Sequence, residues 1–503
     1  MSGKSTEKNS PGSNANIQGD EYSSPSPALV GYTNGSSFVE DTTSQYPYPD
    51  DYAPPKGLRG LFYHPRTQVV LLGFVCFMCP GLFNALNGLG AGGQIDSATS
   101  ANANSTLYAT FAVAAFFAGS INNILGPRLT LFLGSSGYAI YIGSYLVVNI
   151  HNNAGGFMIA AGAVLGLCAG LLWTAQGSLM LAYPTENQKG TFIGIFWSIF
   201  NLGGVVGASV SLGQNFHSET NRVSNGTYIG FMILTGMGSL IPLLMADPDK
   251  MIRTDGSKVT TPRQPSWKTE IYGLYVALRT DPMIVFLFPM FFAKFNDYNA
   301  ALFNIRARSL NNLVYWVSQI LGSVSIGLLL DQHQFPRRAR AFTGWSILLT
   351  FVLIVHIWAF FYQRTYTRQS MPPDASKMDI YDKGYTAHLF LYIFCGLLDS
   401  MWQTTAYWMM GAMSNDPAKL AYFAGFYKSI QSAGAAGVWR ADAMKVPYMN
   451  LFLSTWVLLI AGLIFSLPMI HLRVKDHTDV EDEVLAHMDE FHRVLPPDSD
   501  VRR

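Results

Sequence analysis

Residues 68–90 read QVVLLGFVCFMCPGLFNALNGLG and contain no charged side chain. A helix that crosses the hydrocarbon core of a bilayer needs about 20 consecutive, mostly apolar residues. Similar runs follow along most of the chain. Because 49% of the residues are hydrophobic and only 13% are charged, the sequence predicts an all-α membrane protein that crosses the bilayer many times.

Twelve runs are long and apolar enough to be transmembrane helices. The predicted spans are 68–90, 105–124, 129–150, 155–182, 190–212, 227–246, 282–304, 310–330, 341–361, 385–413, 420–439 and 448–471. The polar segments around them predict a disordered tail over 1–60, a six-helix bundle over 61–246, a linker over 247–280, a second bundle over 281–472 and a tail over 473–503.

Short motifs recur between the two predicted bundles. Phe83-Asn84-x-x-Asn87, near the end of the first span, returns as Phe295-Asn296-x-x-Asn299 near the end of the seventh. Two asparagines three residues apart are costly in an apolar run, so an accidental repeat is unfavourable. The repeat predicts two related halves of six helices each.

A second pair of motifs follows the second helix of each half. The first half has Gly119-x-x-x-Asn123-x-x-Gly126-x-Arg128, and the second has Gly327-x-x-x-Asp331 followed by Arg337 and Arg338. These segments resemble the signature of the major facilitator superfamily. In that superfamily the acidic residue and the arginines form a charge clasp on the cytoplasmic side, so the resemblance implies a clasp of Asp331 with Arg337 and Arg338. Asn123 replaces the acid in the first half, which implies a weaker clasp with Arg128.

Within this superfamily, the chain resembles the Unc-ninety-three-like (uncoordinated) family, in particular its fungal branch. The resemblance rests on CPGLFNAL at 79–86, GLGAGGQ at 88–94 and WTAQG at 173–177, and it covers about 60–475. It implies a twelve-helix facilitator fold. It also implies two kinds of function, because some relatives transport solutes while others regulate or escort channels and receptors.

Four charged side chains fall inside predicted spans of the second half: Lys294, Asp297, Asp399 and Lys428. Intramembrane charges cost about 2.5–3.5 kcal/mol each and usually face a cavity or a partner. Lys294 and Asp297 are three residues apart on one helix face, and Asp399 and Lys428 form a plausible pair. These groups could couple transport to protons, bind a substrate, or form fixed ion pairs that hold the helices in register.

Neutral polar side chains suggest a solute-binding cavity. Amides and indoles at this depth can bind a polar or partly aromatic solute. Hydrogen bonding between helices is the favoured explanation of any single amide, except at Asn84 and Asn296, where the repeat makes the two explanations equal. The candidates are Asn84, Asn87, Trp173, Gln176, Asn296, Asn299, Trp402 and Gln403.

Basic residues and sequons predict the orientation. An amino terminus in the cytoplasm places more Lys and Arg on the inside, and an even number of spans returns the carboxyl terminus there. Two glycosylation sequons, at Asn104 and Asn225, then lie outside. The sequence does not distinguish the plasma membrane from an internal one.

Several function classes find no support in the sequence. Cys76-x-x-Cys79 lies in an apolar run with no second ligand pair nearby, so packing is favoured over a metal site. A net charge of +1 offers no basic patch for nucleic acid. We expect no catalytic residue and no cofactor. The expected partners are the lipid bilayer and a small molecule or ion, and the alternative function requires a membrane-protein partner.

Overall fold

The structure is a computed structural model that describes residues 57–89, 97–151, 153–184, 189–217, 223–253, 302–332, 334–371, 376–413 and 417–474, together with positions 259, 272, 275, 279, 286, 287, 289 and 290. All of them belong to one compact unit, Tyr48–Arg503. The predicted seventh span, with Lys294, Asn296, Asp297 and Asn299, lies outside the described residues apart from a few positions.

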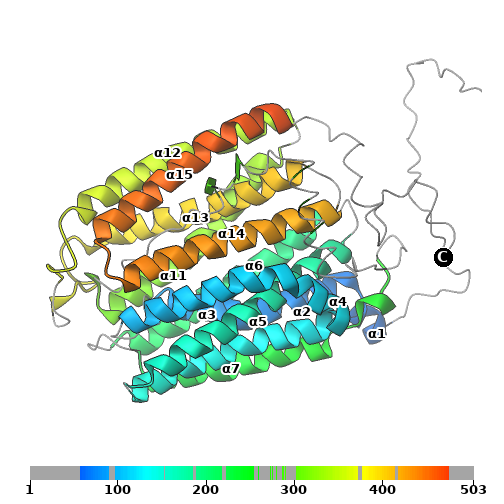
Figure 1. Cartoon of the computed structure of the whole chain (residues 1–503), viewed down its shortest axis with the longest axis horizontal. Helices are drawn as coiled ribbons and strands as arrows, with labels where there is room; N and C mark the ends of the chain where they lie inside the picture. Colours follow the sequence, from blue (N-terminus) through cyan, green and yellow to red (C-terminus); the bar gives the residue numbers. More distant parts are fainter. Residues whose placement is uncertain are drawn as a thin grey trace, which may run out of the picture. The chain divides into compact units, whose positions relative to one another are not determined.

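The first half is a bundle of long helices (Figure 1). Its elements are α1 (Gly57–Phe62), α2 (Pro65–Cys76), the π-helical turn η1 (Phe77–Gly81), α3 (Leu82–Asn87), α4 (Ser97–Ile150), α5 (Gly155–Ala182), α6 (Lys189–Asn215) and α7 (Asn225–Leu244). Together, α2, η1 and α3 form the first span, Pro65–Asn87, and the π turn contains Pro80, which has no N–H to donate.

The second half follows the short 3₁₀ turn η4 (Pro248–Lys250). Its described helices are α11 (Ile305–Leu330), α12 (Arg337–Gln363), α13 (Tyr385–Met413), α14 (Pro417–Ala443) and α15 (Tyr448–Arg473). Among the described residues, eight helical segments of both halves are long and apolar enough to cross a membrane. Several helices begin earlier than the sequence predicts, because polar residues such as Ser97 and Arg306 join their first turns.

The segment α4 contains two predicted spans that meet at Gly126. Its φ of 76° lies in the left-handed region that glycine tolerates, and Pro127 follows it. The chain turns back there, since Tyr141 on the second arm donates a hydrogen bond of 3.1 Å to Asn104 on the first. Gly126 and Pro127 therefore form the tight connection between the second and third spans.

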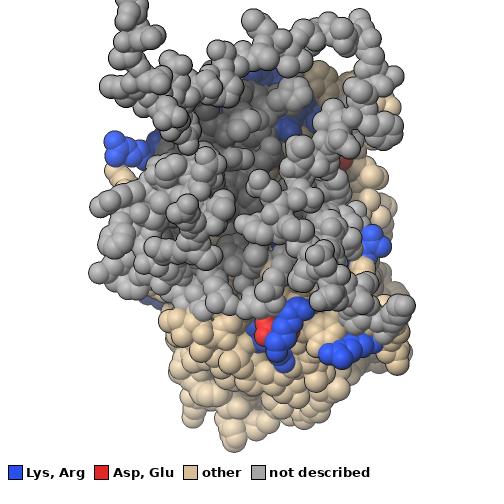
Figure 2. Space-filling model, turned by 90° about the vertical axis from the view of Figure 1, so that its right-hand side faces the viewer, with Lys and Arg blue, Asp and Glu red and all other residues tan. Residues whose placement is uncertain are grey.

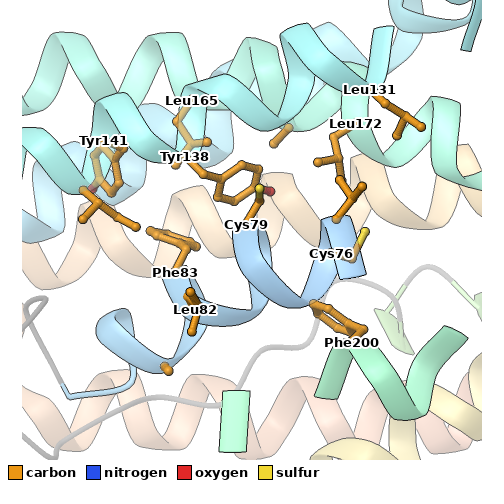
Figure 3. Close-up of a cluster of buried hydrophobic side chains, with 14 of the residues drawn as sticks. Cys76, Cys79, Leu82, Phe83, Leu131, Tyr138, Tyr141, Leu165, Leu172 and Phe200 are labelled. Atoms are coloured by element: carbon orange, nitrogen blue, oxygen red, sulfur yellow. The ribbon is translucent and has the colours of Figure 1, made fainter. Parts of the chain in front are cut away.

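Each half has its own hydrophobic core. In the first half, Phe83 contacts Tyr138 and Tyr141 edge-on, with ring centroids 5.6 Å apart in both pairs (Figure 3). Cys76 and Cys79 are buried in this core, and the Cys79 thiol lies 3.6 Å from the Thr235 carbonyl oxygen. A separate cluster fills the second half, where α12, α13 and α15 meet.

The two halves meet along two helix pairs. The first arm of α4 packs on α14, and α6 packs on α11. Large apolar side chains such as Leu133, Phe157 and Leu321 are exposed on the helices, as expected for surfaces that face lipid. We call the end of the bundle that holds α1 the α1 end (right in Figure 1) and the opposite end, where α3 ends and α11 begins, the closed end.

Candidate functional site: a cavity between the halves

A cavity of about 1120 Å³ lies between the two halves. Its lining comes from α3, α4, α5 and α6 of the first half and from α11, α13 and α14 of the second, with a few residues of α12 and α15. The lining reaches exposed positions at the α1 end, including Ile193, Leu328 and Asp331. Among the described residues, the cavity lining therefore reaches the surface at the α1 end.

Hydrogen bonds between α4 and α14 join the halves at the closed end. Arg440 Nη1 donates to Asn102 Oδ1 over 2.8 Å, and Ser105 Oγ donates to the Ala436 carbonyl over 3.0 Å. Closer to mid-depth, Ser429 Oγ donates to a carbonyl of α4 over 3.2 Å. These bonds hold the two helices together on the side away from the opening.

A second set of bonds joins α11 to the end of the first span. Arg308 is almost completely buried, and its Nε donates to the Leu89 carbonyl over 2.5 Å. One turn further along α11, Asn312 Nδ2 donates to the Ala85 carbonyl over 2.5 Å. Because the last carbonyls of a helix have no partner within it, α11 supplies the donors that the first span needs.

Asp399 lies at the centre of a polar cluster on the cavity wall. Its Oδ2 accepts from Tyr315 OH over 2.5 Å and from Gln319 Nε2 over 2.7 Å, and its Oδ1 accepts from Gln403 Nε2 over 3.1 Å. The two donors on α11 and the one on α13 are all neutral. Neutral donors thus supply the three hydrogen bonds that the Asp399 carboxylate accepts from the described residues.

Lys428 projects from α14 into a group of aromatic rings. Its Nζ lies 5.2 Å from the ring centroid of Tyr427, 5.5 Å from that of Trp173 and 5.7 Å from that of Tyr407. It donates one hydrogen bond of 3.0 Å, to Gln431 Oε1. Between the two described side chains Asp399 and Lys428 there is no direct ion pair, because each uses other partners.

Most of the polar residues that the sequence singles out, and that the structure describes, line the cavity. These are Asn84, Asn87, Trp173, Gln176, Asp399, Gln403 and Lys428. Trp402 does not, because its side chain is buried and its Nε1 donates to the Met290 carbonyl over 3.0 Å. Gln403, one residue further along α13, faces the cavity instead.

The structure assigns Asn104 to a role other than glycosylation. Its side chain is fully buried, donates to Asn87 Oδ1 over 3.2 Å and accepts from Tyr141. A glycosylated Asn104 could not keep this buried position, so the structure gives no support to the prediction of a glycan there. Asn225 is exposed at the start of α7.

Two arginines of the clasp motifs donate to backbone carbonyls. Arg338 Nε donates to the Val474 carbonyl over 3.2 Å, and Arg128 donates to the carbonyl of Leu243. Asp331 is exposed and caps the carboxyl end of α11. Arg337 begins α12, and the side chain of Asn123 lies outside the described residues.

Sequence reasoning missed the contribution of α11. Asn312, Tyr315, Gln319 and Ser323 all line the cavity, at spacings of three and four residues that place them on one helix face. The neutral polar residues predicted from the sequence lie in other spans, and none of them belongs to this stripe. Arg308 was missed because α11 begins before the predicted start at 310.

The helices around this cavity define a membrane protein of the major facilitator fold. The xylose transporter XylE of Escherichia coli, in a partially occluded inward-open conformation, matches the structure with a TM-score of 0.55 at 13% identity, over 82% of this chain and 98% of that chain. The D-xylose–proton symporter matches over the same shares with a TM-score of 0.54 at 14% identity. The predicted fold class, an all-α membrane protein with twelve helices in two halves, is thereby confirmed.

The family is shown by sequence. The model of the ion channel regulatory protein UNC-93 matches residues 91–467. An UNC93-like protein of Schizosaccharomyces pombe is 47% identical over 83% of this chain and 84% of its own length. The chain therefore belongs to the UNC-93 family, as its motifs predicted.

Proposed function

We propose that this protein is a secondary transporter that carries a small solute through the central cavity by alternating access. The observation that supports this most is a cavity lined by both halves that is open at one end and closed at the other by hydrogen bonds between them. A net contribution of about 1 kcal/mol for each such bond makes the closure reversible. The buried residues of the two halves form largely separate clusters, although Ile305 of α11 joins the cluster of the first half, so the halves can rock as rigid bodies.

A cross-link at the closed end tests the proposal. In a background without native cysteines, Ser105→Cys and Ala436→Cys together join α4 to α14 after oxidation. We expect oxidation to stop uptake into proteoliposomes, and reduction to restore it, because the closed end must open in each cycle. The solute is first selected by its stabilisation of the purified protein against heat.

The matched control joins two helices within one half. Asn149 on α4 and Asn225 on α7 are in contact, because Asn149 Nδ2 donates to Asn225 Oδ1 over 2.6 Å. Oxidation of the Asn149→Cys/Asn225→Cys pair should leave uptake unchanged, because these residues move together. Uptake that persists through the cross-link between the halves would contradict alternating access.

Proton coupling through Asp399 is the further part of the proposal. Asp399 lines the cavity, and neutral donors rather than Lys428 hold it. A carboxylate that reaches the cavity can exchange a proton when the surrounding halves rearrange. Lys294 and Asp297, the other predicted coupling pair, lie outside the described residues.

The second candidate is a regulator or trafficking partner of another membrane protein. The family description, an ion channel regulatory protein, favours it. In that case the purified protein binds a channel or receptor, and no solute crosses liposomes that contain it. The cross-linked and reduced forms would then show the same absence of uptake.

We further propose that the α1 end faces the cytoplasm and that Asn225 carries a glycan. Lys and Arg side chains lie around the described part of the α1 end (Figure 2), which fits the excess of basic residues in cytoplasmic loops. In cells, Asn225→Gln should abolish the mass shift caused by an endoglycosidase. Thr106→Ala, which removes the other sequon and leaves the buried Asn104 in place, should not change it. A wild-type protein without any such shift would contradict this assignment.

A further inference from the structure

The charged side chains of the cavity differ in how many of their possible hydrogen bonds are made within the protein. Among the described residues that line it, the full charges are Asp331 at the mouth and Asp399 and Lys428 further in. Asp399 already accepts three hydrogen bonds. A Lys ammonium can donate three, and Lys428 donates one to a side chain that the structure describes, Gln431. The cavity therefore has more unused capacity for an anion than for a cation.

The surroundings of Lys428 hold its ammonium group in place. Gln431 accepts from Lys428 and donates to Tyr427 OH over 3.0 Å, so its amide orientation is fixed from both sides. The faces of Tyr427, Tyr407 and Trp173 stabilise a cation by cation–π attraction. Trp173 belongs to the first half, so a ligand on Lys428 sits where the two halves meet.

An aromatic wall continues from this position. Trp173 stacks on Trp197 with ring centroids 6.3 Å apart, and Trp197 lies 6.1 Å from Tyr407. Phe200 packs edge-on against Trp173 at 5.6 Å. These rings come from α5, α6 and α13, and they form an aromatic, largely apolar wall beside the Lys428 ammonium. Such a surface fits a planar or alkyl group attached to an anionic head.

From this arrangement we infer that the cavity binds a small organic monocarboxylate, with its carboxylate on Lys428 and its apolar body against Trp173, Trp197 and Tyr407. Lys428 offers one ammonium group, which can pair with one carboxylate. The Asp399 carboxylate in the same cavity repels any anion, and it repels a singly charged carboxylate less strongly than a phosphate dianion. The monocarboxylate is the substrate class of the proposed transporter. Its passage across the membrane rests on the proposed function, whereas its binding to Lys428 does not.

The test uses matched probe pairs that differ only in charge. Benzoate is compared with benzamide, and indole-3-acetate with indole-3-acetamide, at equal ionic strength on the purified full-length protein. We expect the carboxylates to raise the melting temperature and to quench tryptophan fluorescence saturably, and the amides to do neither. Equal effects of acid and amide, or no effect of either acid, would overturn the inference without any substitution.

Substitutions then locate the site. Lys428→Met should weaken benzoate binding by about 10- to 100-fold, the factor of a lost hydrogen bond to a charged group, while Lys428→Arg keeps most of the affinity. Lys383→Met, which removes an exposed lysine outside the cavity, should leave the affinity unchanged. A folded Lys428→Met variant with wild-type affinity would rule out this site.

The binding assay separates this inference from the proposed function, because it requires no movement of the halves. Saturable benzoate binding without uptake would keep the anion site and reject the transporter. Uptake of a neutral solute that is insensitive to Lys428→Met, together with no carboxylate binding, would keep the transporter and reject the anion site.

Discussion

Replacing Asp399 by asparagine is expected to remove the response of uptake to an imposed pH gradient and to destabilise the protein by about 2–4 kcal/mol. The carboxylate accepts from Tyr315, Gln319 and Gln403. Asparagine has one acceptor oxygen, and its NH₂ group would face at least one of these donors. The hydrogen bonds to a charged acceptor are lost or weakened, and one buried donor loses its partner. Thermal unfolding of the purified variant and uptake at several external pH values measure the two effects.

The control for this variant is the same substitution at an exposed carboxylate. Asp382 lies outside the cavity and accepts from the Asp379 N–H over 2.7 Å, a bond that an asparagine oxygen can also accept. Asp382→Asn should change stability by less than about 0.5 kcal/mol. Asp399→Glu tests whether a carboxylate in a different position still supports the pH response of uptake. Wild-type pH dependence in a folded Asp399→Asn variant would remove this residue as the coupling site, although the cavity would still admit a solute.

The fold was largely predictable because a bilayer imposes a simple requirement. Each crossing must satisfy its backbone within one helix, so an uncharged run such as 68–90 leaves little choice of structure. The helix ends were less predictable. Polar residues such as Asn102 and Arg308 extend α4 and α11 beyond the apolar runs, since α14 and the first span supply their partners.

The cavity was predictable in part. Asn84 and Gln403 were identified because a polar group in an apolar run is costly unless it faces water or a partner. Their neighbours show the limit of that reasoning. Trp402, like Gln403, is a polar side chain in an apolar run. Viewed down the helix, however, Trp402 points about 60° to one side of Asp399, whereas Gln403 points to the other side. Only the hydrogen bond from Trp402 Nε1 to the Met290 carbonyl shows that the Trp402 indole is bound inside the second half.

The contacts between the halves were not predictable from the sequence. Ser105 and Asn312 look like ordinary polar residues of a span, and their roles depend on which end of the cavity is closed. A transporter that works by alternating access has one set of contacts between its halves for each end that it closes, and a single sequence encodes both sets. The sequon at Asn104 shows the same limit, because its pattern says nothing about the buried contacts with Asn87 and Tyr141.

Replacing Gly203 by alanine is expected to impair folding. A Cβ at this position would lie 2.4 Å from the Phe77 carbonyl oxygen and 2.8 Å from the Phe77 Cα, which are backbone atoms of η1. Gly81 makes the reciprocal approach, since its Cβ would lie 3.1 Å from the Gly203 Cα. Backbone cannot rotate out of the way as a side chain does, so α6 must separate from the first span. We expect a loss of about 1–3 kcal/mol or more and a sharp fall in the yield of monodisperse protein.

Gly213 provides the matched control on the same helix. A Cβ there would meet nothing within 4 Å, so Gly213→Ala should be neutral or stabilise α6 by up to about 1 kcal/mol. Thermal unfolding of both variants, followed by size-exclusion chromatography, compares the same added methyl group at two positions. Equal melting temperatures would mean that α6 and the π turn do not pack as closely as the structure shows. Gly203 lies where α6 crosses the first span, and the same helix also packs on α11 of the second half. The close approach at Gly203 therefore fixes the position of α6 both in the core of the first half and at the interface between the halves.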